Sequence, residues 1–116
     1  MVTKIHSMEA LNAVLKSEKR VLLYIGTNDC SVCQSTKPRI EAILTAYPRF
    51  RGVEVSVYEH PDIAGQFLAF SLPVVLIFEE GREVFRSGRF LDFHQIEAML
   101  QRRDENSNED HPVSGS

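Results

Sequence analysis

Two cysteines separated by two residues are the side chains of this sequence best suited to covalent chemistry. Cys30 and Cys33 are the only cysteines in the chain, and they follow an apolar run at residues 21–25. A Cys-x-x-Cys pair between a buried strand and a helix is typical of a thiol–disulfide redox site. On the first turn of a helix, two such cysteines share one face, with Cα atoms within the roughly 4.4–6.8 Å that a disulfide requires.

The start of a helix gives the two thiols different roles. Unpaired backbone N–H groups and the positive end of the helix dipole favour a thiolate there, which lowers the pKa of Cys30. Because the thiolate is the attacking species in exchange, we assign Cys30 as the nucleophile and Cys33 as the resolving thiol. The charge of Asp29 opposes ionisation of Cys30, and Lys37, one turn past Cys33, offsets some of that effect. The sequence leaves the net direction open.

Two other interpretations of the cysteine pair are weaker. The pair could be inert apolar filler, or it could be half of a zinc site. A structural zinc site needs four ligands, but the sequence has no second Cys-x-x-Cys and no His-x3-5-His. The four histidines are scattered along the chain, so no metal site is expected; they are His6, His60, His94 and His111.

Length and composition indicate a single globular domain. The chain has 116 residues, of which 43% are hydrophobic and 25% are charged, as is ordinary for such domains. A net charge of −3 gives no reason to expect binding to nucleic acid or to an anionic membrane. There is neither an 18-residue apolar run nor a basic leader followed by an apolar one. We therefore expect a cytoplasmic protein, in a compartment that keeps dithiols reduced. A monomer is expected as well, although no feature of the sequence specifies the oligomeric state.

Hydrophobic periodicity predicts the elements that position the cysteines. It predicts helices near residues 8–15, 31–47, 61–68 and 93–101, and strands near residues 2–5, 21–25, 53–58, 74–78 and 83–86. Pro38 falls inside the second helix, where it removes one backbone hydrogen bond. The order predicts an α/β fold with a mixed central β-sheet flanked by helices on both faces. Residues 1–103 would form this domain, and the polar residues 104–116 would be a disordered tail.

Four features together resemble the thioredoxin family, over roughly residues 1–103. They are the strand before the pair, the Cys30-Ser31-Val32-Cys33 motif, Pro38 five residues after it, and Leu72-Pro73 directly before a strand. The resemblance implies the thioredoxin fold. It also implies a cis peptide bond at Pro73, which would face the two cysteines and shape the substrate groove. A cis bond would leave the N–H and C=O of Leu72 available to pair with an extended substrate.

The sequence departs from the family pattern at the residues that tune the site. Thioredoxins proper carry Trp-Cys-Gly-Pro-Cys, whereas here Asp29 replaces the tryptophan and Ser31 and Val32 separate the cysteines. Thioredoxins also have a buried aspartate in the preceding strand, where this chain has Tyr24. We interpret Tyr24 as a core residue whose hydroxyl is hydrogen-bonded. The redox pair is therefore expected to be retained with a different tuning.

The leading hypothesis is a thiol–disulfide oxidoreductase that reduces protein disulfides and needs no cofactor other than its own cysteines. It implies a protein disulfide as substrate and an upstream reductase as partner. The alternative is a binding module of the same fold, with Phe70 or Phe90 as apolar contacts beside Pro73 and inactive or regulatory cysteines. A third hypothesis is a glutaredoxin-like reductase of small-thiol mixed disulfides, which would need Cys30 alone.

Overall fold

The two strands at the centre of the sheet are apolar on both faces, which is why the fold has two hydrophobic cores. The computed structural model describes residues 2–27 and 31–109, apart from the side chains of residues 31, 32 and 106–109. In β2 (Arg20–Gly26), every residue is buried, and in β4 (Val74–Glu79) all but the last are buried. Successive side chains of a strand point to opposite faces, so each of these strands supplies both cores.

The elements follow the order predicted from the sequence. Besides the two central strands, they are β1 (Val2–Lys4), α1 (Met8–Ser17), α2 (Ser31–Thr45), β3 (Arg51–Ser56), α3 (Pro61–Gln66), β5 (Arg82–Gly88) and α4 (Phe93–Glu109). The sheet has the strand order β1-β3-β2-β4-β5. Strand β3 is parallel to both of its neighbours, whereas β4 is antiparallel to β2 and β5. The predicted mixed sheet is confirmed.

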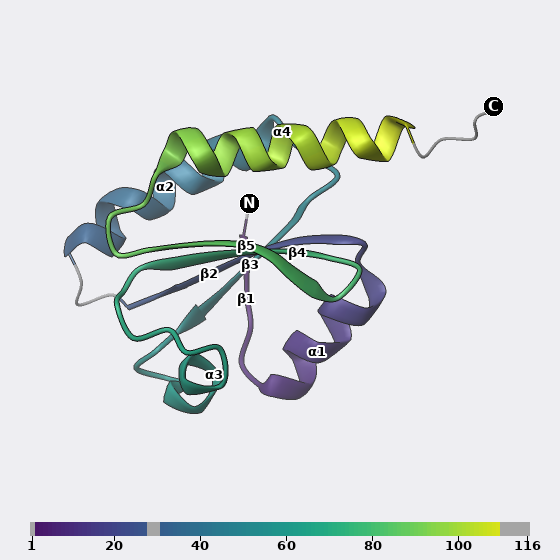
Figure 1. Cartoon of the computed structure of the whole chain (residues 1–116). Helices are drawn as coiled ribbons and strands as arrows, with labels where there is room; N and C mark the ends of the chain where they lie inside the picture. Colours follow the sequence, from purple (N-terminus) through teal and green to yellow (C-terminus); the bar gives the residue numbers. More distant parts are fainter. Residues whose placement is uncertain (1, 28–30, 110–116) are drawn as a thin grey trace.

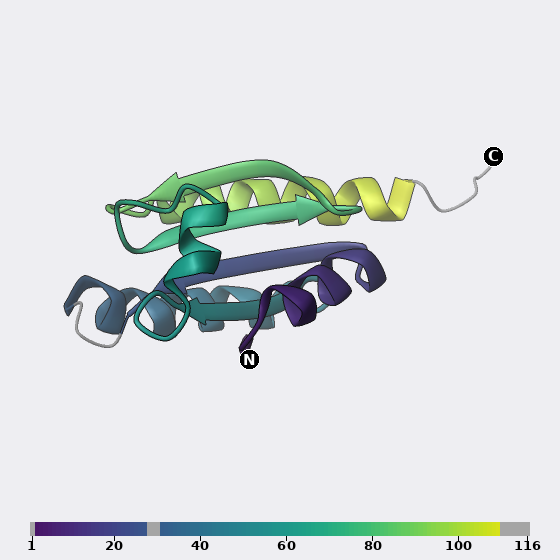
Figure 2. The same ribbon diagram turned by 90° about the horizontal axis from the view of Figure 1, so that it is seen from below.

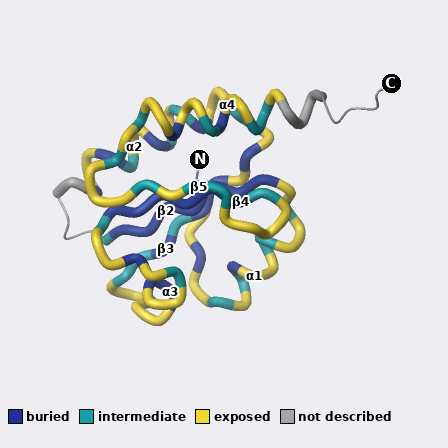
Figure 3. The backbone as a smooth tube through the Cα atoms, in the orientation of Figure 1, coloured by how far each residue is buried: buried dark blue, intermediate teal, exposed yellow. Residues whose placement is uncertain are grey.

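Helices cover both faces of the sheet. Helices α2 and α4 lie on one face, and α1 and α3 lie on the other (Figures 1 and 2). The core under α1 and α3 includes Leu23 and Leu76, while the core under α2 and α4 includes Tyr24 and Ile77. Burial is concentrated in the central strands, and the outer helix surfaces are exposed (Figure 3). No helix in the described part of the chain has the length and apolar content needed to cross a membrane.

The last helix is longer than the sequence predicts. Helix α4 crosses the expected domain boundary at residue 103, so residues 104–109 are helical where a disordered tail was predicted. Contacts with the domain account for the extension: the Arg103 side chain pairs with Glu79, and Arg49 pairs with Asp104 at 3.6 Å. These contacts join residues far apart in the sequence, so local composition does not reveal them. Residues 110–116 lie outside the described part.

Candidate redox site

Cys33 lies on the first turn of α2, as the sequence analysis predicted, and its side chain is only 4% exposed. The helix begins at Ser31, directly after Cys30 in the chain. Asp29 and Cys30 themselves lie outside the described residues, as do the side chains of Ser31 and Val32. Their assignments as nucleophile and tuning residues therefore stay predictions.

Tyr24 anchors the first turn of α2 to the sheet. Its side chain is 3% exposed, and its hydroxyl donates a hydrogen bond to the carbonyl oxygen of Cys33 at 3.0 Å. The same hydroxyl lies 3.0 Å from Oγ1 of the buried Thr36, which also reaches the Cys33 carbonyl at 3.3 Å. The interpretation of Tyr24 as a hydrogen-bonded core residue is confirmed. Its hydroxyl holds the backbone of the predicted resolving residue.

Gly26, the last residue of β2, allows the thiol of Cys33 to approach the sheet. A Cβ atom at position 26 would lie 3.1 Å from the Cys33 sulfur and 3.0 Å from a ring carbon of Tyr24. Such distances are shorter than ordinary van der Waals contacts, so the absence of a side chain creates the space that Cys33 occupies. Sequence reasoning missed this role, because a glycine after a strand is also typical of an ordinary turn.

The Lys37 ammonium group contacts a carboxylate of the neighbouring strand. It lies 2.7 Å from Oε1 of Glu54 on β3, and the two side chains are 34% and 14% exposed. Both residues line a cavity of about 300 Å³ that Tyr24, Gly26 and Cys33 also line. The sequence analysis expected Lys37 to offset the charge of Asp29. Asp29 lies outside the described residues, so that expectation stays a prediction, and the ion pair with Glu54 adds a partner of Lys37 that the sequence did not indicate.

Pro73 lies at the end of the sheet that carries Gly26. Ile25 of β2 pairs with Val74 of β4 in antiparallel register. The next residue of β2, Gly26, and the residue before β4, Pro73, therefore lie at the same end of these two strands. The peptide bond between Leu72 and Pro73 is cis, as the family resemblance implied. Pro73 is buried, and its carbonyl oxygen accepts a hydrogen bond from Arg89 N at 2.7 Å.

Exposed apolar side chains lie on the segment before Pro73 and on the segment around Arg89 that is hydrogen-bonded to it. Leu68 and Phe70, which precede it, are 64% and 78% exposed, and Phe90, which follows Arg89, is 76% exposed. The hydrogen bond from Arg89 to Pro73 connects the two chain segments that carry Phe70 and Phe90, and we call these two exposed side chains the apolar rim. A rim of this kind suits an apolar partner segment.

Among the described residues, clear pKa shifts occur on β5 and just after α2. On β5, paired hydrogen bonds from Arg86 lower the pKa of the Glu83 carboxyl and raise that of Arg86 itself. After α2, burial raises the pKa of the Tyr47 hydroxyl, and the nearby Glu97 carboxylate raises it further. Glu83 pairs with Phe78, far along the hairpin from the Val74–Gly88 pair beside Pro73.

Comparison with known proteins agrees with this geometry. A family model described as Thioredoxin matches residues 2–102. The thioredoxin-like protein YdfQ of Bacillus subtilis is 31% identical over 101 residues, which cover 87% of this chain and 90% of that protein. The thioredoxin of Mycoplasma genitalium is 31% identical over 91 residues, covering 78% and 89% of the two chains. The crystal structure of thioredoxin from Trypanosoma brucei brucei matches 90% of this chain and 92% of its own, with a TM-score of 0.82 and 15% identity.

The fold and these matches together define the class of protein as a thiol–disulfide oxidoreductase. The chain belongs to the thioredoxin family.

Proposed function

We propose that this protein reduces protein disulfides through Cys30 and Cys33, without a bound cofactor. The thiolate of Cys30 attacks one sulfur of the partner's disulfide and forms a mixed disulfide, and the partner's other sulfur leaves as a thiolate. The Cys33 thiolate then attacks the Cys30 sulfur, the mixed disulfide breaks, and the partner's first sulfur also leaves as a thiolate. The partner gains two electrons and, after taking up two protons, is a dithiol, while Cys30 and Cys33 give up those electrons and end as a disulfide.

The observation that carries this proposal is the burial of Cys33 on the first turn of α2, three positions after Cys30. A resolving thiol has to be reached by its neighbouring cysteine rather than by solvent or by the partner. The hydrogen bond from Tyr24 to the Cys33 carbonyl fixes the backbone of Cys33. The absence of a side chain at Gly26 leaves space for the Cys33 sulfur. The helix start favours a thiolate at Cys30, the residue before it.

The partner segment would lie along Leu72 and Pro73, between Phe70 and Phe90. An extended chain that adds to a sheet edge gains backbone hydrogen bonds, and pockets for its side chains give specificity. The exposed phenylalanines support a partner with apolar residues next to its disulfide. Asp29, Ser31, Val32 and Pro38 would tune the reactivity of the pair.

The reducing direction fits a cytoplasmic protein, where the thiol pool keeps such pairs reduced. An upstream reductase would then restore the dithiol after each turnover, and the chain would take part in electron transport and redox homeostasis as a monomer. Neither a membrane nor nucleic acid is expected as a partner.

An equilibrium redox titration, read by thiol alkylation and mass, tests the proposal. We expect a reversible two-electron transition at about −270 mV, the thioredoxin range. A potential about 100 mV higher would indicate an oxidant or isomerase instead. If no Cys30–Cys33 disulfide forms at any potential, the dithiol mechanism is wrong, and a binding module of this fold becomes the better explanation.

Two single variants separate protein disulfides from small-thiol adducts as substrates. Cys33→Ser should trap a mixed disulfide with a protein substrate and lose turnover, whereas Cys30→Ser should form no adduct. If Cys33→Ser instead keeps full activity on a glutathione mixed disulfide and the wild type is inactive on protein disulfides, the protein is a glutaredoxin-like reductase.

A further inference from the structure

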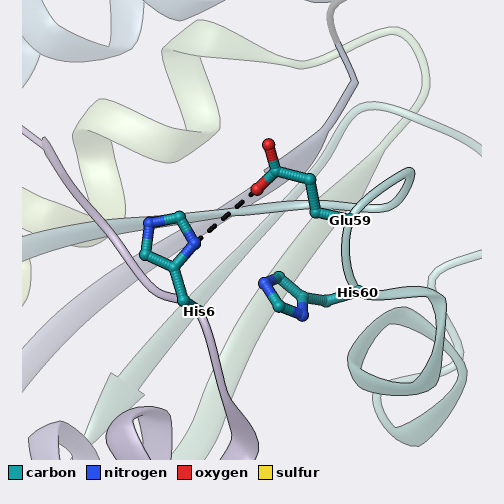
Figure 4. Close-up of side chains that lie close together, drawn as sticks. All are labelled: His6, Glu59 and His60. Atoms are coloured by element: carbon teal, nitrogen blue, oxygen red, sulfur yellow. Dashed lines mark ion pairs between the residues drawn. The ribbon is translucent and has the colours of Figure 1, made fainter.

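Two loops bring three metal-ligating side chains together beside the redox site. His6 lies between β1 and α1, and Glu59 and His60 lie between β3 and α3, more than fifty positions later. The potential ligand atoms of the three side chains all lie within 4.8 Å of one another, and Figure 4 shows His6 and Glu59 facing each other with His60 alongside. We propose that His6, Glu59 and His60 bind a divalent transition-metal ion, with Zn²⁺ as the best-suited ion.

The backbone on both sides of His6 is fixed by hydrogen bonds. The N–H of Ile5 donates to the carbonyl of Glu54 on β3 at 2.8 Å. On the other side, the Ser7 hydroxyl caps α1 by accepting from Ala10 N at 3.0 Å. His6 therefore stands on a short connection that is held at both ends, and its backbone position does not depend on a metal.

His60 is held in the same way. Its N–H donates to the carbonyl of Ser56 at 2.8 Å, and its own carbonyl accepts from Ile63 N at 3.2 Å, which begins the hydrogen bonding of α3. Pro61 follows it at the first turn of this helix. Because the backbone is held at both loops, side-chain rotation alone can complete a metal site.

Two imidazoles and one carboxylate form a donor set that zinc uses when one coordination position stays open to water. Without a metal, the cluster is held by weaker contacts: Nδ1 of His6 lies 3.6 Å from Oε1 of Glu59, and the two imidazole rings meet edge to face at 5.7 Å. Zinc bonds of about 2.0–2.2 Å place tetrahedral ligands roughly 3.3 Å apart. The His6 and Glu59 side chains are 64% and 53% exposed, so they are free of the packing that would prevent this closure.

The charge of the surroundings also suits a cation. His6 and Glu59 line the cavity of about 300 Å³ that Cys33 also lines, and the other charged groups of this lining are Lys4, Lys37, Glu41 and Glu54. Together with Glu59, the lining therefore holds three carboxylates and two ammonium groups. Lys37 and Glu54 pair with each other, which leaves Glu41 and Glu59 against the single charge of Lys4. The bound ion would lie at the rim of this cavity, held by residues other than the redox cysteines.

The test is a titration of the full chain, free of any affinity tag, with Zn²⁺ alone. A Cys30→Ser/Cys33→Ser background removes thiolate ligands, and calorimetry gives the stoichiometry and dissociation constant. We expect one ion per chain, bound at micromolar concentration. His6→Ala and His60→Ala should each weaken binding by at least about tenfold, since even the loss of an outer-shell partner of a metal ligand costs about 10- to 100-fold in affinity. His94→Ala, an exposed histidine at the start of α4, is the matched control and should change nothing.

A second measurement does not depend on any variant folding correctly. In the wild-type chain, Zn²⁺ should shift the imidazole NMR signals of His6 and His60 and leave that of His94 in place. With Co²⁺, the absence of sulfur-to-metal absorption would show that the thiolates are not the ligands. The proposal is wrong if no ion binds at millimolar concentration, if His6→Ala and His60→Ala bind as tightly as the His94→Ala control, or if sulfur-to-metal absorption accounts for all binding.

Discussion

The hydroxyl of Tyr24 donates a hydrogen bond of 3.0 Å to the carbonyl oxygen of Cys33, which connects the central strand of the sheet to the first turn of α2. Thr36 completes a triangle of three oxygens with Tyr24 and Cys33. The hydroxyl groups of Tyr24 and Thr36 each lie within hydrogen-bond distance of the Cys33 carbonyl and of each other, but each has only one proton to donate. Either hydroxyl can therefore serve the Cys33 carbonyl when the other is removed.

This arrangement predicts a modest effect of Tyr24→Phe. The change removes one buried hydroxyl, but Thr36 can still donate to the Cys33 carbonyl, so we expect a loss of about 1 kcal/mol in the free energy of unfolding. Urea unfolding measures it, with Tyr58→Phe, at a residue that is 74% exposed, as the control. A loss above about 3 kcal/mol would mean that Thr36 does not compensate.

Gly26→Ala tests the close approach of Cys33 to β2. The added methyl group would lie about 3 Å from both the Cys33 sulfur and the Tyr24 ring, so one of them must move. Overpacking of this kind costs about 1–3 kcal/mol, and displacement of the sulfur should slow the resolution of a mixed disulfide, measured by rapid-quench alkylation.

Gly65→Ala is the matched control for that variant. Gly65 lies in α3, and a Cβ atom there would have no neighbour within 4 Å. Alanine is favoured over glycine in helices, so we expect unchanged exchange rates and a stability equal to the wild type or up to about 1 kcal/mol higher. If both alanine variants behave alike, the space at position 26 has no role in the site.

Phe90→Ser tests the apolar rim beside Pro73. The side chain is 76% exposed and contributes little to the core, so folding stability should change by less than about 0.5 kcal/mol. Loss of its contact with a protein partner should raise KM for a protein disulfide several-fold. Oxidation by a small disulfide, which does not span the rim, should keep its rate. Equal losses on both substrates would contradict a docking role.

Glu79→Gln should destabilise the protein strongly. Glu79 binds Arg20 at 3.0 Å and also pairs with Arg103 of α4, and Arg20 is only 3% exposed. The variant leaves a buried guanidinium without a counter-charge, so we expect a loss of about 2–4 kcal/mol, slightly below the value for fully buried pairs. Thermal and urea unfolding both measure it.

The neighbouring Glu80→Gln is the control for that variant. Its partner Lys19 lies 3.9 Å away, and both side chains are largely exposed, so the change should cost about 0.5 kcal/mol or less. A similar loss in both variants would show that burial of Arg20 does not decide the effect.

Much of the fold could be predicted from the sequence because its strongest signals are local. The apolar runs at residues 21–25 and 74–78 predicted the two central strands, and alternation at residues 53–58 predicted β3. The Cys-x-x-Cys spacing and its place before a helix predicted the position of Cys33, and the family resemblance implied the cis bond at Pro73.

The features that sequence reasoning missed depend on contacts between distant positions. His6 and His60 appear scattered in the sequence, yet β1 and β3 lie side by side and bring their loops together. Lys37 was interpreted from its helical spacing to Cys33, whereas its partner Glu54 comes from a neighbouring strand. The extension of α4 likewise rests on side chains from outside the helix.

The central position of β2 has a consequence for hydrogen exchange. The strand pairs with β3 on one side and β4 on the other, and both of its faces are buried, so its amides cannot open unless both cores are exposed at once. Amides of this kind exchange only through global unfolding. Tyr24, which is paired on both sides, would therefore stay in place while more peripheral parts of the chain open and close, so its contact with Cys33 would persist until the whole domain unfolds.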